Sequence, residues 1–227
     1  MSTSMNWHII GKLMVKDWQL FKLFVFIYVG LGALSAFIMT IQSSFAYYTG
    51  VVMMITVLLG ASAHIVITMI VIEKKENQMS FIMGLPLSVT DYTLSKILGG
   101  IAIYMACWLP IVAILIGFIW FSHMPNGMVP LVVIVSTEVL VATSLLLCVA
   151  IITGHEGITI VVMVLFNLLF NLFLNTVVQI PEINQYIEGD IAVFNSTALS
   201  IIGMEIAVFL LALMFTTYYK SRQACFL

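Results

Sequence analysis

Charged residues are scarce in this sequence. Only 8% of its 227 residues are Asp, Glu, Lys or Arg, against about 25% in an ordinary soluble domain, whereas 63% are hydrophobic. So few polar side chains cannot cover the outside of a water-soluble fold, and the composition therefore excludes a soluble globular protein. The formal net charge of -2 offers no basic surface either, so we expect no nucleic-acid partner.

Disulfide and metal chemistry also lack support in the sequence. The three cysteines are an odd number, and Cys107 and Cys148 lie inside apolar runs, so no disulfide framework is expected. His155 and Glu156 begin an H-E-x-x-H zinc motif, but no second His follows at the required spacing. We therefore expect no metal site in this chain.

A phosphate-binding loop is missing as well. Its pattern is G-x-x-x-x-G-K-[ST], whereas the only Gly-Lys pair, Gly11-Lys12, is followed by Leu13 and has no Gly five residues earlier. We therefore expect that the chain binds no cofactor of its own and that it cannot hydrolyse ATP alone.

Long apolar runs are what the sequence has in abundance. A helix needs about 20 apolar residues to cross the roughly 30 Å hydrocarbon core of a membrane, and the runs here are continuously apolar, unlike the alternating strands of a barrel. We predict an all-α, polytopic membrane protein that forms one transmembrane domain over residues 1–227. The six predicted spans are residues 23–41, 51–72, 97–121, 129–153, 158–178 and 198–219.

The distribution of positive charge predicts the orientation of these spans. All eight Lys and Arg residues fall before the first span, between the second and third spans, or after the sixth span. The loops at 42–50, 122–128 and 179–197 contain none. Because basic residues are retained on the cytoplasmic side, we expect both termini in the cytoplasm.

The first 22 residues are expected to form an interfacial helix before the first span. Its apolar side chains recur at three- and four-residue spacing, opposite a polar face formed by Lys12, Lys16 and Asp17, as in helices that lie on a membrane surface. The alternative is an early start of the first span with a polar edge. The apolar residues of the predicted face are Trp7, Ile10, Met14, Trp18 and Phe21.

Residues 73–96 are predicted to form a cytoplasmic helical hairpin. Gly84 can end the first helix and Pro86 prevents its continuation, while Ser88 and Asp91 resemble a capping box that begins the next helix. Its tip is apolar, which suits either a protein interface or packing on the membrane or the amino-terminal helix. The tip residues are Met79, Phe81, Ile82, Met83, Leu85 and Leu87.

This segment carries a family resemblance. It has an acidic-basic cluster that ends a span, an apolar helix, Leu-Pro followed by a small residue, and then an aromatic residue and a Lys that open the next span. In this pattern the chain resembles the short permease subunits of bacterial type-2 ATP-binding-cassette (ABC) exporters. The matching positions are Glu73, Lys74, Glu76, Leu85, Pro86, Ser88, Tyr92 and Lys96, with Lys16 and Asp17 before the first span.

The resemblance implies a location in the cell membrane of a bacterium, and it implies several partners and elements. A coupling helix at 73–84 would sit in a cleft of a separate cytoplasmic ATPase that binds ATP and Mg, and residues 1–22 would be the elbow helix. Residues 179–197 would be an extracytoplasmic re-entrant segment. A second permease, identical or related, would complete the transporter. The expected ATPase-coupling residues are Glu73, Lys74, Glu76, Met79, Phe81, Ile82, Met83, Leu85 and Pro86.

Three ionisable residues lie inside predicted spans, where such groups are costly and therefore functional candidates. Glu138 and Glu205 fall at similar depth in the outer half of the bilayer, so both could line one cavity and meet a cationic substrate or carry a proton. Alternatively, both are protonated by burial or hydrogen-bonded to neighbours. His64 has the same two interpretations, function or an interhelical hydrogen bond.

Four amide side chains follow one side of the fifth span. Asn167, Asn171, Asn175 and Gln179 recur at four-residue intervals, and such a row is costly against lipid. It should face another helix, a second subunit or a hydrated path. Together with Glu138 and Glu205, these residues are our candidates for a substrate path.

The leading functional hypothesis is export of an amphipathic or hydrophobic substrate, such as a peptide, toxin, drug or lipid. The chain itself would be surrounded by membrane lipid. In size and layout the chain is similar to permeases of antimicrobial or cytolytic peptide exporters, including those for phenol-soluble modulins. Two alternatives use Glu138, Glu205 or His64 directly: a membrane-embedded enzyme, or a self-contained secondary transporter. No paired ligand motif or internal repeat supports either alternative.

Overall fold

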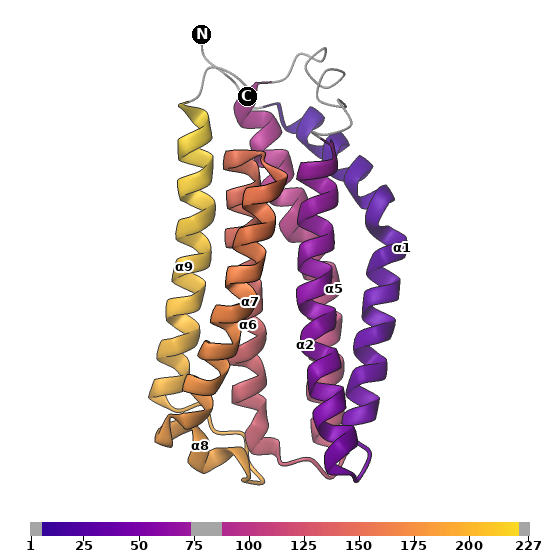
Figure 1. Cartoon of the computed structure of the whole chain (residues 1–227), viewed down its shortest axis with the longest axis vertical. Coiled ribbons are helices and arrows are strands. Elements are labelled where there is room, and N and C mark those ends of the chain that lie inside the picture. The colour runs from indigo at the N-terminus through magenta and orange to yellow at the C-terminus, as the bar shows by residue number, and fades with distance from the viewer. Residues whose placement is uncertain (1–5, 74–87, 223–227) are drawn as a thin grey trace.

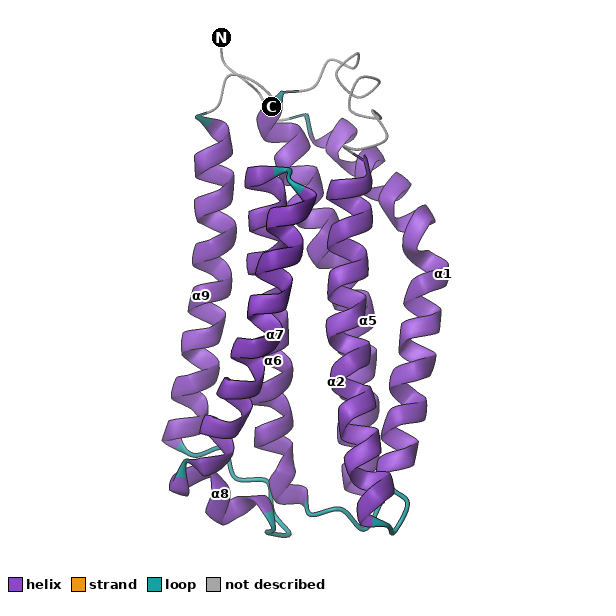
Figure 2. Cartoon of the chain, viewed as in Figure 1, coloured by secondary structure: helices purple, strands orange, loops and turns teal. Residues whose placement is uncertain are grey.

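A computed structural model describes residues 6–73 and 88–222, and these residues form helices joined by short loops (Figure 1, Figure 2). Six helices among them are long and apolar enough to cross a membrane, which confirms the predicted all-α class and number of spans. They are α1 (Trp7–Met39), α2 (Ser44–Val66) extended by the π-helix η1 (Ile67–Ile72), α5 (Val89–Phe121), α6 (Val129–Thr153), α7 (Glu156–Gln179) and α9 (Ser196–Ser221). The side on which the termini lie stays a prediction.

The six long helices run along one common direction (Figure 1). α1 packs against α2 and α5, and α6 packs against α7 and α9 as well as against α2 and α5. The largest cluster of buried apolar side chains lies between α1, α2, α5 and α6, with Phe21, Ile65, Tyr104, Ile111 and Leu147 each at most 2% exposed. α6 therefore joins two groups of helices.

A glycine allows α1 and α2 to approach closely. A Cβ atom added at Gly50 would lie 2.8 Å from the carbonyl oxygen of Ser35 and would overlap the Met39 side chain. Any larger residue would force the backbones apart, so Gly50 sets the distance between the two helices near their connecting loop. Close backbone approach at small residues is the usual way in which helices associate in membranes.

The predicted start of the third long helix is confirmed. The Ser88 Oγ atom accepts a hydrogen bond from the Asp91 backbone N–H at 3.1 Å, and the Asp91 carboxylate accepts one from the Ser88 N–H at 3.4 Å. This reciprocal pair is a capping box with Asp in place of Glu or Gln. α5 consequently begins at Val89, well before Lys96.

The amino-terminal segment differs from the prediction. α1 is continuous from Trp7 to Met39, so no helix boundary at residue 22 separates an elbow helix from the first span, although the helix changes direction over its first turns (Figure 1). No Gly or Pro lies between residues 12 and 29 to end the helix. The predicted faces are also wrong in part, because Asp17 is buried with Ile10 and Phe21, whereas Trp18 is exposed.

The segment 179–197 folds into the short helix α8 (Pro181–Ile187) and an extended link to α9. It contacts the loop between α5 and α6, which contains the short helix η2 (Asn126–Met128). The Gly127 N–H donates to the Gly189 carbonyl oxygen at 2.8 Å, and the Asn126 amide donates to the Asp190 carbonyl oxygen at 3.1 Å. Two loops therefore close this end of the bundle, and re-entry into a membrane stays a prediction.

Candidate functional site: a buried charge cluster at the root of residues 74–87

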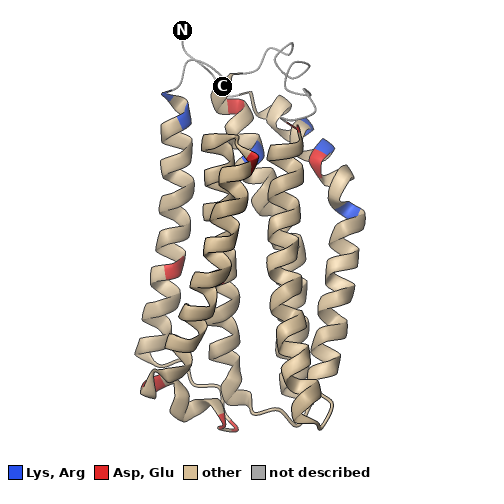
Figure 3. Cartoon of the chain, in the orientation of Figure 1, with Lys and Arg blue, Asp and Glu red and all other residues tan. Residues whose placement is uncertain are grey.

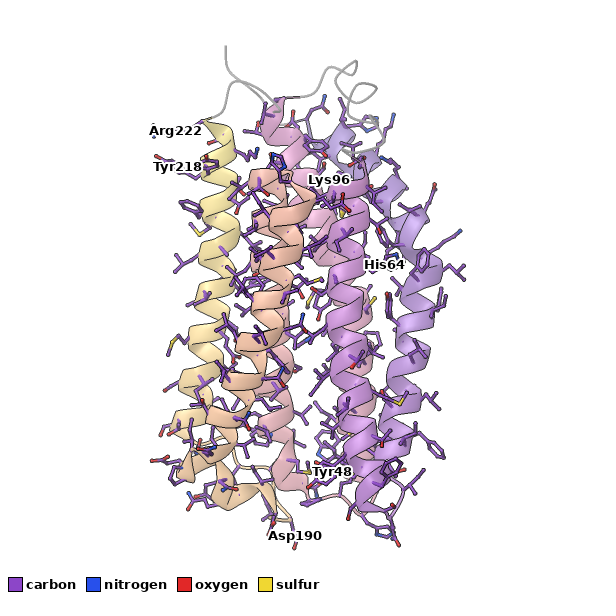
Figure 4. All side chains as sticks on the ribbon, in the orientation of Figure 1. Tyr48, His64, Lys96, Asp190, Tyr218 and Arg222 are labelled. Carbon is purple, nitrogen blue, oxygen red and sulfur yellow. The ribbon has the colours of Figure 1, made fainter. Side chains whose placement is uncertain are left out.

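Charge is unevenly distributed along the bundle. The described Lys and Arg residues lie toward the end where α1 begins and α9 ends (Figure 3). Lys96 and Arg222 lie toward that end, whereas Asp190 lies at the opposite end (Figure 4). This separation agrees with the uneven distribution of Lys and Arg among the loops in the sequence, although it does not show which end lies on which side of a membrane.

Five of the side chains at the basic end form one connected group, which we call the charge cluster. Lys16 and Asp17 come from α1, Glu73 follows η1 directly, and Tyr92 and Lys96 come from α5. Three separate helices therefore meet in this cluster.

Lys96 is the centre of the charge cluster. Its Nζ atom lies 3.0 Å from Oδ2 of Asp17 and 2.6 Å from Oε2 of Glu73. The same Nζ atom lies 5.7 Å from the centre of the Tyr92 ring, within the range of a cation-π contact. One ammonium group thus binds two carboxylates from two other helices.

Glu73 is the second branching point. Its Oε1 atom accepts a hydrogen bond from Lys16 Nζ at 2.6 Å, and its Oε2 atom accepts one from the Tyr92 hydroxyl at 3.2 Å. Together with Lys96, these contacts give the Glu73 carboxylate partners on both oxygens. Both oxygens of an ionised carboxylate need such partners when they are withdrawn from water.

The charge cluster is buried and electrically balanced. Lys96 is 1% exposed, Asp17 is 2% exposed and Glu73 is 5% exposed, whereas about half of the Lys16 side chain reaches solvent. Two positive and two negative charges cancel. Removing one member of such a group leaves an uncompensated buried charge, which usually costs more than the intact pair contributes.

The environment of Glu73 changes its acidity. Burial alone raises the pKa of the Glu73 carboxyl, but the charge of Lys96 and the hydrogen bonds from Lys16 and Lys96 outweigh it and hold the pKa below the usual 4.5. Glu73 is therefore ionised at neutral pH, and its contribution to stability is lost only when acid protonates it.

Local structure explains why the charges meet here. The π-helix η1 leads directly into Glu73, and π-helical turns are rare and concentrated at functional sites. Gly99 on α5 leaves room beside the cluster, since a Cβ atom there would lie 3.0 Å from Met69 and 3.8 Å from Asp17 Oδ2. The capping box of α5 is also tied to the start of α1, because the Asn6 N–H donates to Asp91 Oδ1 at 3.3 Å.

The charge cluster joins the residue before the segment 74–87 to the helix that follows this segment. Glu73 is the last described residue before this segment, and Tyr92 and Lys96 lie in the first two turns of the helix that follows it. Of the predicted ATPase-coupling residues, Glu73 belongs to the cluster. The others lie outside the described residues: Lys74, Glu76, Met79, Phe81, Ile82, Met83, Leu85 and Pro86.

His64 takes part in a contact between helices. The Tyr28 hydroxyl and His64 Nδ1 lie 3.1 Å apart, joining α1 to α2, and the rings of Phe21 and Phe24 pack against the imidazole edge-on. Of the two interpretations of His64 given by the sequence, this arrangement favours an interhelical hydrogen bond over a functional role.

The two carboxyl groups inside the predicted spans lie on helices that pack against each other, α6 and α9. Glu205 on α9 is 6% exposed, and both of its carboxyl oxygens are buried without a hydrogen-bond partner. Glu138 on the adjacent helix α6 is half-buried and interacts electrostatically with Glu205. That both line one cavity stays a prediction.

The amide row of α7 lies apart from any partner helix. The side-chain amides of Asn167, Asn171 and Asn175 each donate to the carbonyl oxygen one turn earlier on α7. Asn171, Asn175 and Gln179 are exposed, and Asn167 is half-buried. The row thus does not bind α7 to another described helix, which leaves a second subunit or a hydrated path as its use.

An apolar cavity of about 110 Å³ lies between α1, α2, α5 and α6. Met39, Met54 and Met128 contribute to its wall, and the Tyr47 hydroxyl points at the Met128 sulfur at 3.9 Å. None of the six substrate-path candidates lines this cavity. Its unbranched methionine side chains could adapt to an apolar guest.

Comparison with protein-family models, with curated proteins and with solved structures finds no match to this chain. The site is therefore defined by its own geometry. Among residues 6–73 and 88–222, no group of three or more His, Cys, Asp or Glu side chains is placed to hold a metal ion.

Proposed function

We propose that this chain is the permease subunit of a bacterial ABC exporter. A separate cytoplasmic ATPase would bind the segment 73–84 and drive export of an amphipathic or hydrophobic substrate, such as a peptide, toxin, drug or lipid. The proposal combines the sequence resemblance of residues 73–96 with the six helices of membrane-spanning length.

The observation that carries the proposal is the buried charge cluster. A force that an ATPase applies to residues 74–87 moves the membrane helices only if the residues on either side of this segment are held rigidly to those helices. Glu73 directly precedes the segment, and Lys96 is the eighth residue of α5, the helix that follows it. The two side chains are bonded to each other at 2.6 Å, and they are bonded to Lys16 and Asp17 of α1. A buried, fully partnered ionic group is well suited to move as one unit with α1 and α5.

A second permease is part of the proposal. α7 and α9 are the least buried long helices, and the exposed amides of Asn171, Asn175 and Gln179 would be costly against lipid. An amide has both a donor and an acceptor, so the same row on a second copy could pair with it. The substrate would then pass between the two permeases.

Photo-crosslinking in native bacterial membranes tests the ATPase contact. A photoreactive amino acid at position 81 or 82 should crosslink to a protein that carries a G-x-x-x-x-G-K-[ST] loop, which mass spectrometry of the product identifies. Position 45 is the matched control, because Phe45 is a large apolar residue that is exposed in the first turn of α2. It should give no such product.

Loss of coupling provides the second readout. Phe81→Asp and Ile82→Asp should abolish copurification of the crosslinked ATPase while the chain still inserts into the membrane, and Phe45→Asp should leave copurification unchanged. The proposal is wrong if positions 81 and 82 crosslink only to lipid, or if purified chain alone shows substrate transport in vesicles.

A further inference from the structure

The carboxyl group of Glu205 is buried and has no hydrogen-bond partner in the described fold. Its side chain is almost completely buried on α9, inside a helix of membrane-spanning length, and neither carboxyl oxygen has a hydrogen-bond donor. Buried polar groups are almost always hydrogen-bonded, and an unpartnered pair of oxygens on one carboxyl group therefore calls for a ligand.

No cation of the described fold is placed to balance an ionised Glu205. The helices that pack against α9 are α5, α6 and α8, and their described residues include only one Lys or Arg, Lys96, which binds Asp17 and Glu73 in the charge cluster. On α9 itself, Lys220 is 15 residues away, about 22 Å along the helix.

Glu138 on α6 is the second carboxyl group in this part of the fold. Glu138 interacts electrostatically with Glu205, and two carboxylates close together cannot both ionise in an apolar environment without a large cost. Glu138 is half-buried and Glu205 is almost completely buried, so Glu138 is the member of the pair that is closer to the surface of the described chain.

We propose that Glu138 and Glu205 form a proton-binding site between α6 and α9, in which Glu205 holds the proton as a neutral carboxylic acid. The site holds its proton at Glu205 only while α6 and α9 stay packed, since separation would admit water and favour the ionised form.

Infrared spectroscopy of the purified chain in lipid nanodiscs tests this site directly. At neutral pH the spectrum should contain the carbonyl stretch of a protonated carboxylic acid, and this band should shift in D₂O. The band should disappear in Glu205→Gln and persist in Glu138→Gln. Glu182→Gln is the matched control, because Glu182 is exposed on α8, and it should leave the band unchanged.

A reaction on the unchanged chain covers the case in which Glu205→Gln does not fold. Carbodiimides modify protonated carboxyl groups in apolar surroundings, so dicyclohexylcarbodiimide should label Glu205 at neutral pH and leave Glu182 unlabelled, as peptide mass spectrometry would show. The proposal fails if Glu205 is not labelled and the wild-type band is absent. It also fails if sodium or ammonium ions remove the band, because the site would then hold a metal or organic cation instead of a proton.

Discussion

α6 and α7 are consecutive helices of equal hydropathy with opposite environments. In the most apolar 18-residue stretch of each, 61% of the residues of the α6 span are buried, but only 11% of those of α7. α9 resembles α7, again with 11% buried. Hydropathy thus predicts which segments cross a membrane, but it does not predict which of them are enclosed by other helices.

The difference divides the molecule into two groups. The inner group is α1, α2, α5 and α6, which share the main apolar core and, at one end, the charge cluster. The outer pair is α7 and α9, whose large apolar side chains and amides face outward. In a membrane, apolar side chains can face lipid at little cost, whereas the amides cannot. The outer pair is therefore the part of the fold that needs a further partner most.

The largest expected effect is in the charge cluster of the inner group. Lys96→Met should lower the free energy of unfolding by roughly 3–5 kcal/mol, because Asp17 and Glu73 would then lie buried with only Lys16 to balance them. Unfolding in mixed micelles with increasing SDS measures this loss. Lys22→Met, at an exposed position of α1, is the matched control and should have little effect. Equal stability of the two variants would show that the cluster is not structural.

Acid should weaken the inner group more gradually. The partners of Glu73 hold its pKa below the usual 4.5, so its stabilising contribution is fully present above about that pH and is lost as the pH falls through the lower, folded-state pKa. Unfolding measured from pH 7 downward should show this decrease. Glu73→Gln should be less stable at pH 7 and show a flatter dependence on pH, and an unchanged pH profile would contradict the assignment.

A smaller loss of stability is expected from a substitution at Gly127, where η2 contacts α8. Gly127→Ala should cost about 1–3 kcal/mol, since a Cβ atom there would overlap the Tyr186 carbonyl oxygen and force η2 and α8 apart. Thermal unfolding of the purified chain measures this cost. Gly117→Ala on α5 is the control, because a Cβ atom at Gly117 meets nothing within 4 Å, and it should be neutral or slightly stabilising.

The smallest effect on the fold is expected in the outer pair. Asn171→Leu should change the free energy of unfolding by no more than about 0.5 kcal/mol, because the exposed amide bonds only its own helix. The same change should lower the fraction of dimer found by crosslinking in membranes if the row pairs with a second copy. Leu172→Met, at the adjacent exposed position, should change neither quantity. A large loss of stability in Asn171→Leu would place the residue inside the fold of one chain.

Much of the fold can be predicted from the sequence because the signals are local. Continuous apolar runs identify helices that cross a membrane, and the spacing of Ser88 and Asp91 identifies where α5 begins. The predicted boundary at residue 22 is wrong because it rests on an amphipathic pattern that can be satisfied in two ways. Asp17 has the polarity of a surface residue, yet it is bound by the buried side chain of Lys96, which lies 79 positions further along the chain.

The candidate site is harder to predict because its contacts join distant parts of the chain. Lys16, Asp17, Glu73, Tyr92 and Lys96 all belong to the sequence motif, but the motif does not predict that they bond to one another. Opposite charges that flank spans on the same predicted membrane side are the available signal. The missing partners of Glu205 cannot be anticipated from sequence, since burial of both oxygens depends on how α6 and α9 pack.

The π-helix η1 determines the direction in which the Glu73 side chain points. A π turn closes its hydrogen bond one residue later than an α turn, so Ile67–Ile72 accommodates one residue more than an α-helix would over the same turns. Each residue advances an α-helix by about 100°. If Ile67–Ile72 formed an ordinary α-helix, the Glu73 side chain would be rotated by about 100° about the helix axis and would point away from Lys96. One widened turn thus aims the Glu73 carboxylate at Lys96.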